Sequence, residues 1–222
     1  MRILIVKTSS LGDVIHNLPV VSDILRHFPD AVIDWVVEES FAAIPRLHPR
    51  VEEVIPVALR RWRKNLFSSA TWAEIGTFRH QLRAQNYDMV LDTQGLLKSA
   101  LITAQAHGVK CGYDADSARE PIAARFYERR YAVSKYTHAV TRNRQLAAAA
   151  LGYVADSPPD FGIPAPTTNA AWLPRKPYAV LLTATSRDDK LWPEKLWLEL
   201  GQQLSDKGLV SIFPGGSSTE RE

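Results

Sequence analysis

The fold of this chain is indicated most clearly by its first thirteen residues, MRILIVKTSSLGD (residues 1–13). Ile3–Val6 is an uninterrupted apolar run, as expected for a central parallel strand that is covered on both faces. A tight loop of small residues follows at 8–13, and the next segment predicts a helix as far as about His27. A buried strand, a loop and a helix in this order form the repeating unit of a doubly wound sheet.

The same unit recurs along the chain. Strands are predicted at 31–37, 54–57, 89–92, 178–182 and 210–213. Helices are predicted at 72–84, 97–106, 119–128, 138–150 and 193–205. Pro56 assigns the strand at 54–57 to the periphery of its sheet, because proline cannot donate to a central ladder. The alternation predicts an α/β protein with a doubly wound parallel sheet.

A proline-rich segment divides the chain. Residues 156–177 carry six prolines and little periodicity, which predicts a linker between a first domain at 1–155 and a second at 178–222. The second segment offers two strands and one helix, which cannot close a hydrophobic core. We therefore expect the second domain to be incomplete and the natural chain to continue.

The composition is that of an ordinary globular protein, with 45% hydrophobic and 23% charged residues. The formal net charge of +3 gives no support for a nucleic-acid partner. The single cysteine, Cys111, excludes an internal disulfide and a cysteine-rich zinc site. The opening apolar run is too short for a signal peptide, and no stretch of about 20 apolar residues predicts a transmembrane segment. We therefore expect a cytoplasmic location.

The loop at 8–13 contains one glycine, so it matches neither the dinucleotide-binding fingerprint nor a Walker A loop. It brings a carboxylate, Asp13, to the mouth of the sheet. That carboxylate could act as a general base, or it could cap the helix that follows. The residue type and its position, taken alone, favour capping.

Two other segments carry candidate ligand-binding residues. The run RRWRK (residues 60–64) places four cations within five residues, which favours an anionic ligand or a membrane phosphate over a solvated basic turn. The segment TATSRDDKLWPE (residues 183–194) joins hydroxyls and Lys190 to a helix start, which is typical of a pyrophosphate cradle. Its two aspartates have no third ligand in view, so they do not predict a metal.

At this point the residues resemble a known family. The stretches that carry the resemblance are 1–13, 34–39, 60–64, 92–100, 118–121 and 187–194. They are similar to the lipopolysaccharide heptosyltransferase I group of glycosyltransferase family 9, over essentially the whole chain. Members continue with an Asp-Thr-Gly-x-x-His donor motif that these 222 residues do not contain.

The resemblance implies a GT-B fold, in which two Rossmann-like domains hold the acceptor (1–155) and the sugar nucleotide (178–222). It implies inverting transfer of L-glycero-D-manno-heptose from ADP-heptose to the 3-deoxy-D-manno-octulosonic acid (Kdo) of Kdo2-lipid A, without metal or other cofactor. Asp13 would be the general base. The acceptor would be held by Arg60, Arg61, Arg63, Lys64 and Arg119. The donor would be held by Thr185, Ser186 and Lys190.

The resemblance also implies a peripheral location on the cytoplasmic face of the inner membrane, where the lipid acceptor lies. Two alternatives remain open. The chain could belong to another GT-B transferase that uses a different sugar nucleotide. It could also be an inactive fragment that binds anionic lipid through residues 60–64, because the donor domain is incomplete.

Overall fold

The computed structural model describes residues 1–165, 172–183 and 188–215. The chain forms two compact units, Met1–Ala165 and Pro166–Glu222. Each unit is described by itself.

The first unit is built on one six-stranded sheet in which every pair of neighbours is parallel. Its strands are β1 (Arg2–Val6), β2 (Val32–Glu38), β3 (Val51–Val57), β4 (Asn86–Asp92), β5 (His107–Tyr113) and β6 (Arg129–Tyr131). The strand order is β3-β2-β1-β4-β5-β6, the order of the Rossmann fold. The chain therefore winds one way from β1 to β3 and the other way from β4 to β6. β3 is an edge strand, as Pro56 predicted.

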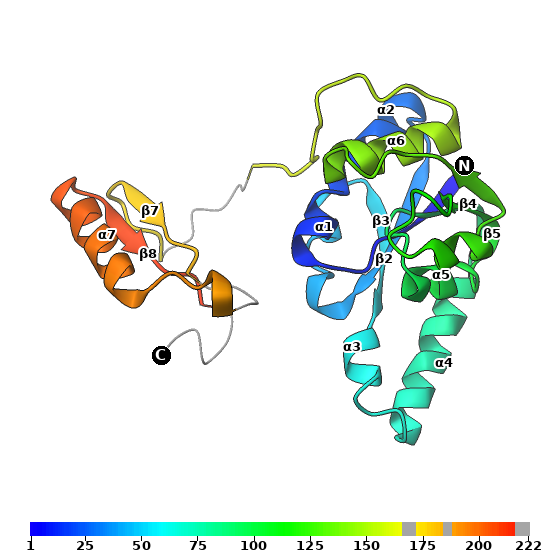
Figure 1. The fold of residues 1–222 in the computed structure, drawn as a ribbon, viewed down its shortest axis with the longest axis horizontal. Coiled ribbons are helices and arrows are strands. Elements are labelled where there is room, and N and C mark those ends of the chain that lie inside the picture. Colours follow the sequence, from blue (N-terminus) through cyan, green and yellow to red (C-terminus); the bar gives the residue numbers. More distant parts are fainter. Residues whose placement is uncertain (166–171, 184–187, 216–222) are drawn as a thin grey trace. The chain divides into compact units, whose positions relative to one another are not determined.

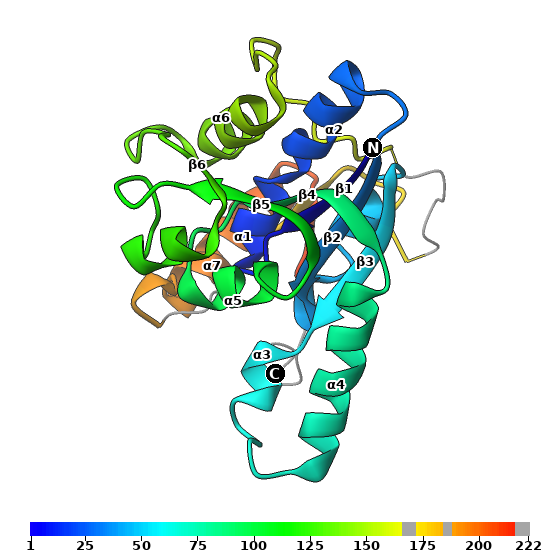
Figure 2. The same cartoon turned by 90° about the vertical axis from the view of Figure 1, so that its right-hand side faces the viewer.

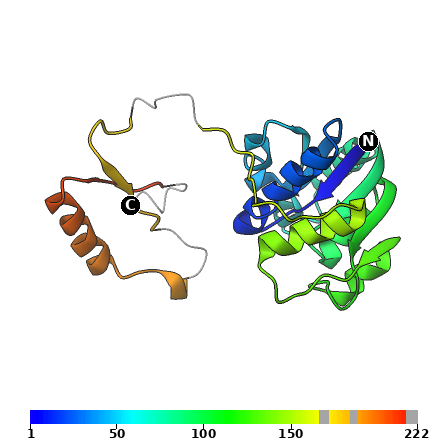
Figure 3. The same ribbon diagram turned by 90° about the horizontal axis from the view of Figure 1, so that it is seen from above.

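Helices cover both faces of this sheet (Figures 1 and 2). One face carries α1 (Leu11–Ile15), α2 (Leu18–His27) and α6 (Ala139–Leu151). The other carries α3 (Leu59–Trp62), α4 (Ser69–Arg83) and α5 (Leu97–Thr103). Short 3-10 turns lie at η1 (Glu39–Phe41), η2 (Pro45–Leu47) and η3 (Pro121–Phe126). Figure 3 shows α2 and α6 lying over the strands of the sheet.

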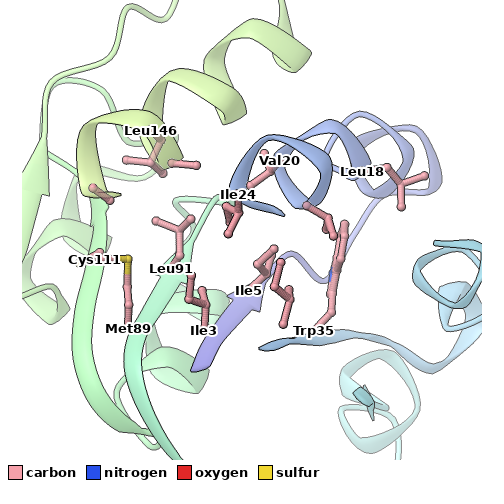
Figure 4. Close-up of a cluster of buried hydrophobic side chains, with 14 of the residues drawn as sticks. Ile3, Ile5, Leu18, Val20, Ile24, Trp35, Met89, Leu91, Cys111 and Leu146 are labelled. Atoms are coloured by element: carbon pink, nitrogen blue, oxygen red, sulfur yellow. The ribbon is translucent and has the colours of Figure 1, made fainter. Parts of the chain in front are cut away.

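The apolar run of β1 supplies both cores, because successive side chains of a strand point to opposite faces. Ile3 and Ile5 belong to the core under α2 and α6, where Figure 4 shows them near Ile24. Leu4 and Val6 belong to the core under α4 and α5. All four of these β1 side chains are fully buried, which explains why this strand is apolar throughout.

Three predictions for this unit differ from the structure. The helix expected from the first loop to His27 is two helices, because Pro19 stands in the first turn of a separate α2. Strands β5 and β6 were not predicted. The range 119–128 forms the 3-10 turn η3 and not an α-helix, since the chain joins the sheet again directly afterwards, at Arg129.

The first unit also extends further than predicted, to Ala165. Arg144 on α6 donates to the carbonyl oxygen of Ser157 at 2.8 Å. Gly162, at a positive φ of 62°, lies so close to His48 that a Cβ would meet its ring. The first part of the predicted linker therefore packs on this unit.

The second unit contains β7 (Tyr178–Val180), η4 (Asp188–Lys190), α7 (Glu194–Asp206) and β8 (Val210–Ile212). β7 and β8 pair in parallel, as two strands joined by a crossover helix require. Among the described residues, no helix has the length and apolar character needed to cross a membrane.

Candidate active site

The site lies where the winding of the sheet reverses, at the carboxyl ends of the neighbouring strands β1 and β4. Ligands of open α/β sheets bind in the crevice at such a switch point. Gln94 joins the two strand ends. Its Oε1 accepts hydrogen bonds from the amides of Thr8 (2.7 Å) and Ser9 (3.2 Å). Its Nε2 donates to the carbonyl oxygen of Ser9 at 2.8 Å. The side chain is buried, so these contacts fix both loops.

Asp92 holds the β4 loop from beneath. Its Oδ1 accepts from the amides of Gln94 (2.8 Å) and Gly95 (3.1 Å), and its Oδ2 accepts from the Tyr127 hydroxyl at 2.7 Å. Complete burial raises the pKa of Asp92, against the lowering effect of these hydrogen bonds. Because every contact is internal, Asp92 is a structural support for the site.

Asp13 lies in the first turn of α1, and the structure shows how its two carboxylate oxygens are used. Its Oδ2 accepts from the amide (3.0 Å) and the hydroxyl (3.1 Å) of Ser10, the residue that caps this helix. The capping interpretation is therefore correct for Oδ2. Arg119 Nη1 lies 3.6 Å from the same oxygen. Among the described residues, Oδ1 accepts no hydrogen bond.

Asp13 is held as a carboxylate. Burial by itself raises the pKa of Asp13, but the hydrogen bonds from Ser10 and the positive charges of Lys7 and Arg119 outweigh it and hold this pKa below its ordinary value. A half-buried carboxylate at the mouth of a pocket is thus ionised at neutral pH, which a general base requires.

Asp13 opens onto a polar pocket of about 240 Å³. The pocket is lined by Lys7, Asp13, Thr93, Gln94, Arg119, Lys135, Thr137, Ala139, Arg142 and Asn143. Four of these residues are cations and one is an anion. A pocket with this excess of positive charge suits an anionic ligand.

Lys7 is the most buried of these cations. Its Nζ donates to the carbonyl oxygen of Thr93 at 2.9 Å, and the residue is 5% exposed. Burial lowers the pKa of Lys7 to about 8, although the charges of Asp13 and Asp92 oppose this effect. Near neutral pH it remains charged and contributes to the low pKa of Asp13.

The basic run is divided by its local structure. Arg60 and Arg63 line a second pocket of about 480 Å³. Its lining residues are Glu38, Leu59, Arg60, Trp62, Arg63, Leu66, Ile75 and Lys98. Arg61 instead forms ion pairs with Glu39 (3.0 Å) and Glu74 (2.7 Å). Lys64 is exposed and lies outside the pocket lining.

Lys98 lies between the second pocket and the loop that leads to Asp13. It lines the second pocket, and its Nζ donates to the Ser9 hydroxyl at 2.7 Å, in the loop that leads to Asp13. Burial lowers the pKa of Lys98. Lys98 therefore links the lining of the second pocket to the loop before Asp13.

The predicted donor residues are only partly described. Thr185 and Ser186 lie outside the described residues, and Lys190 ends the short turn η4. Within the described ranges, no cluster of three histidine, cysteine or acidic side chains could hold a metal ion.

The sequence did not identify Lys7, Lys135 or Arg142 as site residues. Lys7 had a usable signal, because a cation directly after a buried strand stands at the mouth of the sheet. Lys135 and Arg142 had none, because they come from a loop and a helix that only the folded chain brings near Asp13. By contrast, Arg119 was identified from the sequence, and the structure places its Nη1 3.6 Å from Asp13.

Known proteins resemble this chain over its whole length. The family model described as glycosyltransferase family 9 (heptosyltransferase) matches residues 75–222. Lipopolysaccharide heptosyltransferase 1 of Escherichia coli K12 is 50% identical over 224 residues, covering 100% of this chain and 70% of that protein. The protein of the same name from Salmonella typhimurium LT2 is 48% identical, covering 99% of this chain and 70% of that protein.

Solved structures agree in fold. E. coli heptosyltransferase WaaC with ADP-2-deoxy-2-fluoro heptose superposes with a TM-score of 0.91 and 49% identity, over 99% of this chain and 70% of that one. E. coli ADP-heptose lps heptosyltransferase II gives a TM-score of 0.73 at 21% identity, over 99% of this chain and 66% of that one, which supports the fold alone. From the family match, the whole-chain identity and the shared GT-B fold it follows that this chain belongs to glycosyltransferase family 9, the heptosyltransferases.

Proposed function

We propose that this protein is an inverting glycosyltransferase that moves L-glycero-D-manno-heptose from ADP-heptose to the Kdo of Kdo2-lipid A, in the synthesis of the lipopolysaccharide inner core. The names of the relatives support this assignment, since lipopolysaccharide heptosyltransferase 1 is 50% identical across the whole chain. The donor is supported by the WaaC structure, which was solved with an ADP-linked fluoro heptose.

The observation that carries the proposal is the ionised Asp13 at the switch point, with one oxygen occupied by the helix cap and the other turned to no partner within the described residues. In the proposed reaction, the acceptor hydroxyl attacks the anomeric carbon of the heptose from the face opposite the diphosphate. The new carbon–oxygen bond forms while the bond to the diphosphate oxygen breaks, and Asp13 takes the hydroxyl proton.

The low pKa of Asp13 has a consequence for the order of these events. A carboxylate held below its ordinary pKa is a weak base, so it cannot deprotonate a free sugar hydroxyl in advance. Proton transfer therefore accompanies attack, when the hydroxyl becomes acidic. The base needs correct position more than basicity, and the capping contacts from Ser10 supply that position.

Both proposed substrates are anionic, which accounts for the cationic side chains of the site. The acceptor carries carboxylates and phosphates, and Arg60, Arg63 and Arg119 present guanidinium groups that suit both. Lys64 is proposed to act with them, and Arg61 is proposed to contribute less to acceptor binding because it already pairs with Glu39 and Glu74. On the donor side, Thr185, Ser186 and Lys190 are proposed to hold the diphosphate and stabilise the charge on departing ADP without a metal.

We propose that the two parts of the chain bind different substrates. Residues 1–155 bind the acceptor and residues 178–222 contribute to donor binding. Because the acceptor is a lipid, the protein works as a peripheral protein on the cytoplasmic face of the inner membrane.

The test is a transfer assay with ADP-heptose and a Kdo-bearing acceptor, followed by mass spectrometry of the product. Addition of one heptose with inversion at the anomeric carbon is the expected result, and Asp13→Asn is the matched inactive control. Transfer from another sugar nucleotide but not from ADP-heptose would favour a different GT-B transferase. Binding of acceptor without any transfer would favour a lipid-binding module.

A further inference from the structure

We propose that the turn between α3 and α4 together with the start of α4, residues 63–72, is a membrane-docking tip that inserts its apolar side chains into an anionic lipid surface. The proposal rests on the proposed function in one respect, because membrane binding would serve an enzyme whose acceptor is a lipid. The features that carry it are the shape, the exposed side chains and the charge of this segment, together with its place beside the second pocket.

The tip stands away from the body of its unit. Figures 1 and 2, which view the molecule from directions at right angles, both show α3 and α4 extending beyond the sheet and meeting at their far end. Residues 63–70 are all exposed. A projection of this shape can reach into a surface without bringing the sheet against it.

The tip exposes large apolar side chains. Phe67 is fully exposed, Trp72 is 60% exposed and Leu66 is 48% exposed. Scattered single apolar residues on a surface have no special meaning, but a group of this size at one projecting end marks an interaction site. Aromatic residues of this kind are also typical of the boundary between lipid and water.

Hydrogen bonds within the tip fix its conformation. The indole N–H of Trp72 donates to the carbonyl oxygen of Leu66 at 2.9 Å, and the amide of Ser68 donates to the carbonyl oxygen of Asn65 at 3.1 Å. These bonds hold the turn closed while the rings face solvent. The polar group of the tryptophan is therefore satisfied within the protein, so its ring can enter lipid without leaving an unpaired donor.

The tip itself carries only positive charge, although Arg61 at its base pairs with Glu39 and Glu74. Residues 54–73 contain no aspartate or glutamate, and they contain the four cations of the run at 60–64. A cationic collar next to apolar side chains complements an anionic membrane, where each cation near the surface adds to binding and the aromatic groups enter the interface. This complementarity favours lipid over a protein partner.

The tip is continuous with the site. Leu66 belongs to the tip and also lines the second pocket, whose other wall includes Lys98. Lys98 in turn contacts Ser9 in the loop that leads to Asp13. Inserting the tip would therefore bring the mouth of the second pocket to the membrane surface, so a lipid-anchored sugar could reach Asp13 while its acyl chains stay in the bilayer.

The test uses the full chain and vesicles that contain no acceptor, either phosphatidylcholine alone or phosphatidylcholine with phosphatidylglycerol. Co-sedimentation should show binding to the anionic vesicles that weakens with salt. Phe67→Ser should lower the partition coefficient roughly tenfold or more, because one aromatic side chain no longer enters lipid. Lys64→Glu should lower it at low salt. Val154→Ser, which removes another highly exposed apolar side chain, should leave it unchanged.

A second measurement separates this proposal from the proposed function. With a water-soluble acceptor that lacks acyl chains, Phe67→Ser should keep its kcat/KM within about twofold, because Phe67 touches neither pocket. With acceptor in vesicles its activity should fall. Vesicle binding that Phe67→Ser does not change would overturn the docking tip and leave the transferase assignment intact. Vesicle binding that Phe67→Ser abolishes, without any heptose transfer, would support the docking tip and overturn the transferase assignment. Concentration-dependent self-association abolished by Phe67→Ser would mean that the tip binds protein.

Discussion

The backbone amide of Thr8 donates a 2.7 Å hydrogen bond to the side-chain carbonyl of Gln94, although 86 residues separate them in the sequence. This contact ties the loop after β1 to the loop after β4. Asp13 lies in α1, directly after the first of these loops, and Lys98 lies in α5, directly after the second. The geometry of the candidate site therefore depends on the buried side-chain amide of Gln94, which also lines the pocket beside Asp13.

Gln94→Ala is expected to loosen the whole site. It leaves the buried amides of Thr8 and Ser9 without partners, and this costs on the order of 2–4 kcal/mol of folding free energy. The rate should fall as well, because the loop that leads to Asp13 loses its support. Urea denaturation and a transfer assay measure both effects. Gln105→Ala, which removes a surface amide bonded to Leu101, is the control and should change neither.

Asp13→Asn separates catalysis from capping. The amide oxygen of asparagine can still accept from Ser10, so the helix cap survives, but the side chain can no longer take a proton. We expect kcat to fall by roughly 10²–10⁴ while the free energy of unfolding changes by less than about 1 kcal/mol. A near-normal kcat would show that capping is the only role of Asp13.

Lys7 should make acceptor binding depend on pH. Its pKa in the folded protein is about 8, so it loses its charge as the pH rises through this value. The positive charge beside Asp13 then decreases, and the KM for an anionic acceptor should rise. Lys7→Met should weaken binding at neutral pH and abolish this dependence. An acceptor KM in the wild type that stays flat across this window would contradict the assignment.

Lys7 should also affect stability, with a sign that follows from its lowered pKa. Between about 8 and the ordinary value of 10.5, the unfolded chain keeps a proton that the folded chain has lost. The contribution of Lys7 to stability therefore rises with pH in this window, and the cost of burying the charge is fully present below it. At neutral pH, Lys7→Met should stabilise the fold by on the order of 2 kcal/mol. Chemical denaturation on either side of the window measures the effect.

The basic run should divide into two groups. Arg63→Ala is expected to raise the KM for the acceptor roughly tenfold, the scale for losing one charged hydrogen bond. Arg61→Ala should change it much less, because Arg61 is occupied by Glu39 and Glu74. Loss of its exposed ion pairs should change the free energy of unfolding little, because solvent screens them. Equal effects of the two substitutions on KM would show that Arg61 leaves its carboxylate partners to bind the acceptor.

Much of the fold follows from local sequence pattern. The apolar run of β1 and the proline of β3 are short-range signals, and they correctly predicted a central and an edge strand. The pattern failed at β5, where Gly108, Lys110 and Gly112 interrupt the apolar run. Gly112 belongs there because the ring of Tyr127 occupies the space that a Cβ would need, a contact that the sequence of the strand does not record.

The sequence by itself determined the alternation of strands and helices and the position of Asp13 just after the first strand, because strand ends and helix starts depend on neighbouring residues. Only the tertiary structure decided which cations surround that carboxylate. Lys7, Arg119 and Arg142 come from separate segments, and their distances depend on how strands and helices pack. Likewise, local sequence placed four cations at 60–64, but folding paired Arg61 with two carboxylates and turned Arg63 to a pocket. Side-chain environment is a property of the packed chain, since burial and partner charges are set by residues distant in sequence.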